Sequence, residues 1–310
     1  MKFFEIIPPK THFDFVGKFK YAIPLSFILV SSVIFGLWKK GLNFGVDFTG
    51  GTVLQVKFPQ AKTAEDVRKL VTDYGAPDAT VVSMDKQGME YLITSRVAQD
   101  VKGVSELQKK METEFGKGVI QQSDVVGPRV GSELKWAAIQ SLFYSLLFIM
   151  VYIWFRFDFR FAPGATIALI HDLTMALGFY IFSGREFNIT AIAALLTMAG
   201  YGVNDTIVIY DHVRDLFKHK NEGKPLPQII NEAVNMTLSR TVVTSTLVFL
   251  SLVPIAIVCE GELEDFAVAM LVGVIFSSYS TFFLAAPLTV VMENWFEKKE
   301  KRKNTRPATA

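Results

Sequence analysis

Six long apolar blocks constrain the fold of this chain more than any other feature of its sequence. Each block is close to the roughly 20 residues that an α-helix needs to cross a bilayer. The chain has 310 residues, 50% of them hydrophobic, and the apolar ones are gathered in these stretches. The sequence therefore predicts an α-helical polytopic membrane protein. The six blocks cover residues 21–38, 134–155, 161–182, 187–210, 237–258 and 266–292.

The basic residues predict which side of the membrane each connection faces. Lys and Arg occur between blocks two and three, between blocks four and five, and after block six, whereas the two short loops on the other side carry only Arg185. Connections rich in Lys and Arg stay in the cytoplasm. Residues 1–20 and the basic tail 293–310 are therefore expected in the cytoplasm, where the tail suits anionic lipid. The first block, 21–38, acts as an uncleaved signal anchor. The net charge of +2 reflects this asymmetry and not a nucleic-acid-binding face.

A small α+β domain is expected outside the membrane, at residues 39–133, and the other five spans follow within 134–292. The domain sequence reads as strand, helix, strand, strand, helix, strand, which is the order of a split βαβ, ferredoxin-like unit. It contains no His/Cys cluster, phosphate-binding loop or nucleophile–base pattern. We therefore expect it to bind or move, and not to catalyse a reaction. Its strands are predicted at 52–58, 79–84, 90–94 and 119–125.

Two helices of this domain have local signals. Thr63, with Asp66 three residues later, is a typical start of the first helix. The second helix is predicted near 105–115, with Leu107 and Met111 facing the core. The only cysteine is Cys259, near the outer end of block five. No intrachain disulfide supports the domain, so its own core must hold it.

A glycine-rich segment leads from the first span into the domain. It contains Asp47, Gly50 and Gly51. Paired glycines permit positive φ and a close backbone approach. The simpler interpretation is a tight turn that anchors the first strand, and the alternative is a direct contact with a substrate.

Asp205 lies in the fourth apolar block, where a carboxylate is costly. An Asp at a helix centre costs about 2.5 to 3.5 kcal/mol on insertion scales, so it usually faces protein or water and serves an ion or proton pathway. The structural alternative is a hydrogen bond to a neighbouring helix. Arg240 in the fifth block is expected at a similar depth, because the two helices run in opposite directions. It either pairs with Asp205 or extends to the lipid headgroups.

Further polar and small residues lie in the third and fourth blocks. His171 and Asp172 adjoin near the middle of the third, either as an auxiliary proton-handling pair or as hydrogen-bonding partners of neighbouring helices. Gly200, Gly202 and Asn204 are expected to pack near Asp205.

Together these features resemble the SecF family, the smaller partner of SecD in the accessory complex of bacterial Sec protein export. The resemblance covers nearly the whole chain, and the combination of motifs is specific although each alone is not. The motifs are GVDFTGG at 45–51, VGPRVG at 126–131, HD at 171–172, GVNDT at 202–206, LSRT at 238–241 and TS at 244–245.

The resemblance implies a six-helix half of an RND-type transporter in the bacterial inner membrane, paired with SecD. Such a complex uses the proton motive force, without a cofactor or metal, to help pull preproteins out of the SecYEG channel. YajC and YidC are further implied partners. The family's relay carboxylate and arginine fall on Asp205 and Arg240. Burial disfavours the charged form of such a carboxylate and a nearby arginine favours it, so hydration or helix movement can switch its charge.

Three other function classes fit the residues less well. An RND-type exporter of small molecules or lipids would share the relay, but it normally has two six-helix halves, so this chain would have to form an oligomer. An intramembrane aspartyl protease would need a Gly-x-Gly-Asp arrangement, which Val203 and Asn204 interrupt, and no His-Glu-x-x-His zinc motif occurs. A passive scaffold is disfavoured by costly buried charges. The chain is therefore predicted not to be an enzyme.

Overall fold

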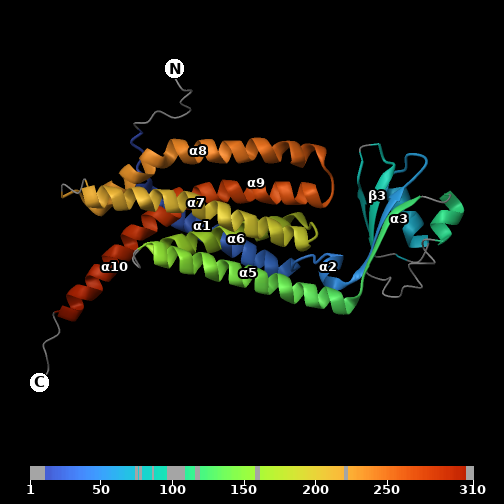
Figure 1. Cartoon of the computed structure of the whole chain (residues 1–310), viewed down its shortest axis with the longest axis horizontal. Coiled ribbons are helices and arrows are strands. Elements are labelled where there is room, and N and C mark those ends of the chain that lie inside the picture. The colour runs from blue at the N-terminus through green and yellow to red at the C-terminus, as the bar shows by residue number, and fades with distance from the viewer. Residues whose placement is uncertain are drawn as a thin grey trace, which may run out of the picture.

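The computed structural model describes residues 11–73, 76, 79–85, 87–95, 109–115, 119–157, 161–219 and 223–304. Long helices lie side by side along the long axis of the molecule, and a small sheet domain stands at one end (Figure 1). Six helices are long and apolar enough to cross a membrane, which confirms the predicted number of spans. In chain order the long helices are α1 (Phe15–Lys40), α5 (Pro128–Arg156), α6 (Ala162–Ser183), α7 (Ile189–His219), α8 (Leu226–Val258) and α9 (Glu262–Ser280), which continues through η1 (Thr281–Ala285) into α10 (Ala286–Asn304).

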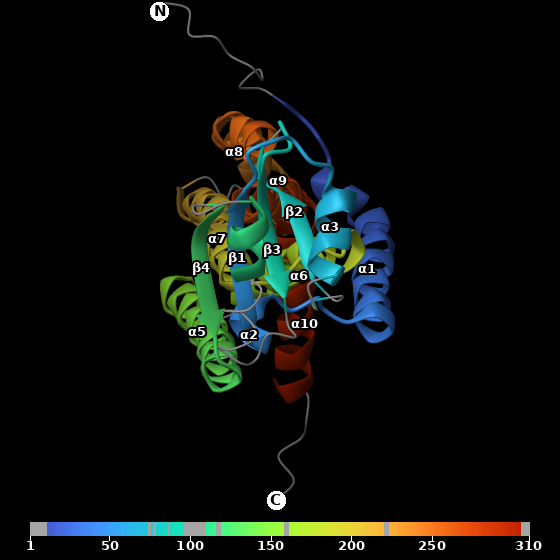
Figure 2. The ribbon, with the colours of Figure 1, turned by 90° about the vertical axis from the view of Figure 1, so that its right-hand side faces the viewer.

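The helices form a central group and a peripheral group. Within the apolar windows of α6, α7 and the α9–α10 span, 56%, 61% and 56% of residues are buried inside the chain, against 22%, 6% and 11% for α1, α5 and α8. Viewed from the domain end, α1, α5 and α8 stand at the perimeter (Figure 2). The three peripheral helices therefore present apolar surface to lipid or to a partner.

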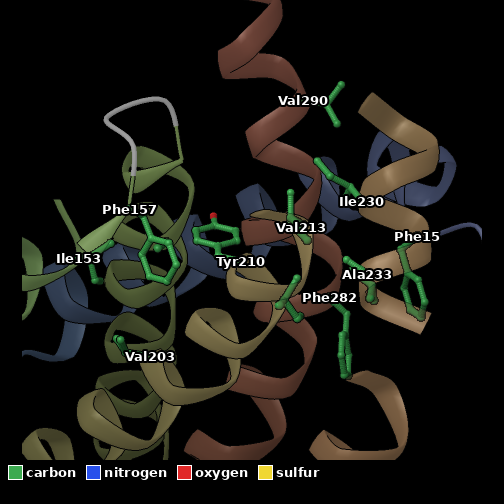
Figure 3. Packing of buried hydrophobic residues seen from close by; sticks show 14 of the residues in the cluster. Phe15, Ile153, Phe157, Val203, Tyr210, Val213, Ile230, Ala233, Phe282 and Val290 are labelled. Carbon is green, nitrogen blue, oxygen red and sulfur yellow. The ribbon is translucent and has the colours of Figure 1, made fainter. Parts of the chain in front are cut away.

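The end of the bundle away from the sheet is closed by an apolar core. Side chains from α1, α5, α7, α8 and the α9–α10 span point into it (Figure 3). Tyr210 of α7 lies at its centre, 5.5 Å ring to ring from Phe157, and donates its hydroxyl to the Ala285 carbonyl at 3.1 Å. The hydroxyl group is thus satisfied inside an apolar environment, as a buried tyrosine requires.

Several helices extend past the apolar blocks from which they were predicted. α7 continues to His219, and α8 begins at Leu226, eleven residues before block five at Thr237. These extensions carry Asn, Asp, Glu and Arg among their apolar residues, so an apolar-block criterion does not detect them. In the extension of α7, Arg214 and Asp211 form an ion pair at 3.1 Å.

Asn231 and Asn235, near the start of α8, bind the backbone around the start of α1. The Oδ1 atom of Asn231 accepts the backbone N–H groups of Phe15 and Val16, both at 3.0 Å. Its Nδ2 donates to Asp14, the N-cap of α1, at 2.8 Å. The hydrogen bond from the Gly17 N–H and then that from Asn231 lower the pKa of Asp14. Two donors that a helix start leaves unsatisfied are therefore taken up by another helix.

The small domain is the predicted ferredoxin-like unit. Its sheet has the order β2-β3-β1-β4, and every neighbouring pair is antiparallel. One face packs on α3 and on the helical residues 109–115, while the other looks toward the membrane helices. The elements are α2 (Val46–Thr49), β1 (Gly51–Lys57), α3 (Ala64–Asp73), β2 (Thr80–Ser83), β3 (Glu90–Ser95) and β4 (Ile120–Val126).

The domain core follows the sequence prediction where the structure describes it. The Thr63 hydroxyl accepts the Asp66 N–H at 3.2 Å, and Asp66 accepts the Thr63 N–H at 3.3 Å, so the predicted cap of α3 is confirmed as a reciprocal box. Met111 is fully buried against Leu54 and Val67, as predicted. Leu107 lies outside the described residues.

Two local features differ from the expectation. The glycine-rich segment forms one helical turn, α2, and not a simple tight turn. The last span is interrupted by the π-helical segment η1. Pro287 lies two residues after η1 and has no N–H to donate to the Phe283 carbonyl, so the regular α-helical ladder is interrupted there.

Candidate functional site

Asp205 is buried in the middle of the bundle. Its side chain is on α7, is 3% exposed, and faces Thr241 of α8. The Thr241 Oγ1 atom is itself buried without an ordinary hydrogen bond, so the approach of the two groups is longer or more bent than such a bond. The carboxylate therefore sits in an apolar environment with incomplete polar compensation.

The positive charge of Arg240 attracts the Asp205 carboxylate, but the two side chains are not in contact. Within the described part of the chain, no ion pair of 4.0 Å or less joins them, and the Arg240 side chain is exposed. The sequence predicts the two residues at a similar depth on neighbouring helices, and α7 and α8 do pack against each other. The guanidinium group extends from the surface of α8 and does not close on the carboxylate.

A chain of hydroxyl groups lies one helical turn from Asp205. The Tyr201 hydroxyl is 3.1 Å from Ser245 Oγ, which is 3.1 Å from Ser278 Oγ. The chain thus links α7, α8 and α9. Beside it, a groove of about 430 Å³ between α8 and α9 is lined by Thr241, Ser245 and Ser278 together with apolar side chains. Polar atoms therefore lead from the surface of the bundle toward the carboxylate.

His171 and Asp172 form a second buried polar cluster, on α6. The His171 Nδ1 atom is 3.2 Å from Asp172 Oδ1, and both side chains are buried. Ser280 and Ser277 of α9 face the Asp172 carboxylate. The other ring nitrogen of His171 and the Ser277 Oγ atom have no hydrogen-bond partner. The hydrogen-bonding capacity of the cluster is therefore only partly used. Its structural role and its proton-handling role both stay predictions.

The small residues of α7 face in two directions. A Cβ atom on Gly202 would lie 2.6 Å from Ser277 Oγ and 3.3 Å from Asp172 Oδ2, so this glycine lets α9 and α6 approach closely. Gly200 has open space around it, and Asn204 is exposed. The face formed by Gly200 and Asn204 is thus left open on a helix that is mostly buried.

The two buried carboxylates have separate surroundings. Asp172 interacts with His171 and two serines, Asp205 with Thr241 and Arg240, and the described residues include no contact between the two. An aspartyl catalytic pair would have to share a proton. The described residues also contain no group of His, Cys, Asp or Glu able to hold a metal ion.

At the end of the bundle nearest the sheet domain, the glycine-rich segment is joined to the start of α7. The Asp47 carboxylate accepts the Ile189 N–H at 3.0 Å. Gly50 and Gly51 have φ of 74° and 150°, which confirms the predicted positive φ at both positions. A Cβ atom on Gly51 would lie 2.5 Å from the Ser95 carbonyl oxygen. The segment is therefore a packed junction and not a free turn.

Two family models match this chain. One, described as protein export membrane protein SecD/SecF, C-terminal, matches residues 106–295, which is more than half of the chain. The chain belongs to the SecD/SecF family. The second, described as the SecD/SecF GG motif, matches residues 35–61 and so includes α2 with Gly50 and Gly51.

The curated relatives are named as translocase subunits of the Sec system. The protein translocase subunit SecF of Magnetococcus marinus is 38% identical over 95% of this chain and 96% of that protein. SecF of Calditerrivibrio nitroreducens is 33% identical over 94% of this chain and 98% of that protein. In Brucella abortus, a protein named SecDF is 33% identical over 92% of this chain but only 38% of its own length. These names describe protein export, a transport role and not a catalytic one.

Solved SecDF structures share the fold. The crystal structure of SecDF from Thermus thermophilus, a translocon-associated membrane protein, matches with a TM-score of 0.83 and 30% identity over 93% of this chain. A SecDF structure in a super-membrane-facing form matches with a TM-score of 0.70 and 30% identity over 95% of this chain. This chain spans 40% of the length of either SecDF.

Sequence reasoning did not single out Tyr201, Ser278 or the cap made by Asp47. Tyr201 and Ser278 are ordinary residues in apolar helices, and only the packing of α7, α8 and α9 brings them to Ser245. Tyr201 directly precedes the GVNDT motif, and this adjacency was the available signal. Asp47 was named for the turn, but its partner is 142 positions away and has no sequence signal.

Proposed function

We propose that this chain is the SecF-type half of a SecD/SecF complex that uses the proton motive force to assist Sec-dependent preprotein translocation. The buried carboxylate of Asp205, attracted by Arg240 but not closed into an ion pair, carries the proposal. An ionisable residue kept at such a cost inside a membrane bundle is by default a functional group. A carboxylate without a tight partner can lose and regain its proton as its surroundings change.

The proton gradient supplies enough energy for such a cycle. One charge moving across about 100 mV is worth roughly 2.3 kcal/mol. The Tyr201–Ser245–Ser278 hydroxyl chain, beside a mostly apolar groove between α8 and α9, gives protons a polar approach toward Asp205. No cofactor is needed in this scheme, and the driving ion is the proton.

The proposed principal partner is a SecD-type chain with six further helices. Two observations support it: relatives exist in which both halves form one SecDF protein, and this chain matches 40% of such a structure. The exposed Arg240 and the open face of α7 at Gly200 and Asn204 are polar or small surface that lipid would cover poorly. A second half covers that surface and adds its own groups to the relay.

The complex lies in the bacterial cytoplasmic membrane with both termini inside, next to the SecYEG channel, with YajC and YidC as additional partners and preprotein as its substrate. The charge asymmetry of the loops supports this orientation. A small-molecule exporter is the less favoured alternative, because the relatives are named as translocase subunits.

The relay is tested by removing its charge while keeping its shape. Asp205→Asn should leave insertion, abundance and partner assembly nearly intact and abolish the gradient-dependent stimulation of export. Arg240→Met should do the same, because it keeps apolar bulk and removes the counter-charge. The assay is completion of preprotein export into vesicles that contain the SecD-type partner. Asp215→Asn, which removes an exposed carboxylate from the end of the same helix, is the matched control.

The double variant separates a relay from a structural pair. Replacing both members of a buried pair can be neutral where breaking one is costly. Recovery of export in Asp205→Asn with Arg240→Met would therefore indicate a structural pair, whereas a relay stays inactive. Full activity of the assembled Asp205→Asn complex would refute the proposal.

A further inference from the structure

The outer end of α7 is capped from another part of the chain. Like every helix start, α7 leaves its first N–H groups without intrahelical partners. Asn188 Oδ1 takes up the Ala191 N–H at 2.9 Å, and the Asp47 carboxylate takes up the Ile189 N–H at 3.0 Å. A carboxylate at a helix N-terminus is also favoured by the helix dipole. Asp47 thus ties α2 to the helix that carries Asp205.

A second contact reinforces this tie. Phe44 and Phe187 form a parallel β-bridge, in which the Gly45 N–H donates to the Phe187 carbonyl at 3.0 Å and the Phe187 N–H to Asn43 at 2.7 Å. The Phe48 ring of α2 lies 6.3 Å from the Phe187 ring, within a buried apolar cluster. The segment around α2 and the loop before α7 therefore form one packed unit.

The external domain enters and leaves the bundle at this same unit. β1 begins at Gly51, directly after α2, and pairs there with Val126, the last residue of β4. α5 begins two residues later, and a Cβ atom on its Gly131 would lie 2.9 Å from the Gly50 nitrogen. Both chain connections of the domain thus meet at α2.

The face of the sheet that looks toward the membrane helices does not pack tightly on them. A cavity of about 320 Å³ separates Val53, Leu92 and neighbouring sheet residues from Gly184, Glu262 and Asp265 at the helix ends. The domain therefore has room to tilt about its attachment. Its orientation depends on the α2 unit more than on that face.

Displacement of α7 at Asp205 can reach α2 through one continuous helix. Ile189 and Asp205 are on the same unbroken α-helix, about 24 Å apart at roughly 1.5 Å of rise per residue. Close-packed helices do not deform gradually. A displacement at one end of such a helix is therefore transmitted along its axis to the other end.

We propose that Asp47 is the positioning residue that couples movement of the Asp205 helix to the orientation of the external domain. It acts through its hydrogen bond to the start of α7 and takes no part in proton transfer. The proposal rests on the relay proposed above and adds the path by which the relay moves the domain.

The experiment compares three variants in the assembled complex, in vesicles, with a Cys259→Ser background. Asp47→Ala removes the acceptor. Asp47→Asn keeps an acceptor, since Asn caps helix starts about as well as Asp. Asn188→Ala is the matched control, because it removes a cap of the same helix start that does not come from α2.

Three quantities are measured in each variant: gradient-driven proton uptake, preprotein export, and the distance between spin labels at Lys69→Cys on α3 and Ser183→Cys at the end of α6. Both label sites are exposed. Asp47→Ala should keep proton uptake but lose export and lose the change in label distance when the gradient is applied. Asp47→Asn and Asn188→Ala should retain all three.

Two results would overturn the coupling role. If Asp47→Ala and Asn188→Ala reduce all three quantities in equal proportion, Asp47 only supports the fold. If Asp47→Asn loses export and the change in label distance as Asp47→Ala does, the negative charge is required and the hydrogen bond to the start of α7 is not the means of coupling. Asp205→Asn in the same vesicles tests the relay separately, because retained proton uptake there refutes the relay whatever the Asp47 variants show.

Discussion

At the scale of single residues, the position of a glycine decides what it contributes. Gly202 and Gly200 are two residues apart on α7, yet only Gly202 lies against other helices. The same contrast occurs between α1 and the sheet domain. Gly41 and Gly51 both have positive φ, but Gly41 has open space where a Cβ atom would be, and Gly51 has the Ser95 carbonyl at 2.5 Å and Val46 Cγ1 at 2.9 Å.

Gly51→Ala should therefore destabilise the protein more than Gly41→Ala. A left-handed conformation costs an ordinary residue roughly 1–2 kcal/mol. At Gly51, crowding against Ser95 and Val46 adds about 1–3 kcal/mol, the usual range for overpacking. Thermal unfolding of the full-length protein in detergent measures the difference. Equal losses in the two variants would show that crowding at Gly51 relaxes without cost.

At the scale of secondary-structure elements, the amphipathic ends of the helices hold the bundle together. The first turns of α8 contribute no membrane span of their own, but Asn231 and Asn235 bind the backbone around the start of α1. Asn235 accepts the Phe13 N–H and donates to the Phe13 carbonyl, both at 2.9 Å. Side chains of α8 thus bind backbone groups at the start of α1, although the two helices are far apart in the sequence.

Asn231→Ala should lower stability by about 1–3 kcal/mol, because it leaves two N–H groups at the start of α1 without acceptors. Thermal unfolding in detergent at neutral pH checks this value. The control is Glu232→Ala, which breaks a half-exposed pair with Lys224 worth about 0–1 kcal/mol. A loss in Glu232→Ala as large as that in Asn231→Ala would contradict the argument.

Acid should reduce the effect of Asn231→Ala without abolishing it. The pKa of Asp14 is lowered, so its contribution to stability is present above the unfolded pKa of about 3.9 and is lost as the pH falls through the folded pKa. Below that pH the Asn231–Asp14 bond weakens in the wild type also. The two bonds to the α1 backbone remain, and they keep part of the difference.

Hydropathy and turn signals were enough to predict the number of spans, the ferredoxin-like order and the α3 cap. They could not predict the amphipathic extensions of α7 and α8, the single turn of α2 or the π-helical segment. Those features depend on contacts between distant parts of the chain, such as Asp47 with Ile189. The burial of Asp205 was predictable from its place in an apolar block, whereas the sequence left two directions open for Arg240, and the side chain takes the exposed one.

At the scale of the whole molecule, burial is distributed unevenly around the bundle. The helices α1, α5 and α8 bury few of their residues within this chain, while α6, α7 and the α9–α10 span bury more than half. A lone bundle with this distribution has apolar sides suited to lipid. The exposed Arg240 of α8 and the exposed Gly200 and Asn204 of α7 are suited to another protein.

The proposed orientation gives a labelling pattern. In the Cys259→Ser background, Lys69→Cys on α3 should react with a membrane-impermeant maleimide in cells whose cytoplasmic membrane is intact. Lys298→Cys on α10 should react only after that membrane is opened. Both positions are exposed, so access alone decides the result. Reaction of Lys298→Cys in intact cells would reverse the assigned sides.

The π-helical segment η1 lets the last span hold an extra residue without turning α10 away from the core. A π-helical turn holds about one residue more than an α-helical turn, so the wide turn completes roughly the same rotation with one residue more. Deletion of a single residue between Thr281 and Ala285 would therefore let the segment close into an ordinary α-helical turn and would nearly keep the direction of α10. Deletion of a residue from the α-helical part that follows would instead turn the rest of α10 by about 100° and carry Val290, now buried, out of the core. A change of length is thus tolerated best at the wide turn.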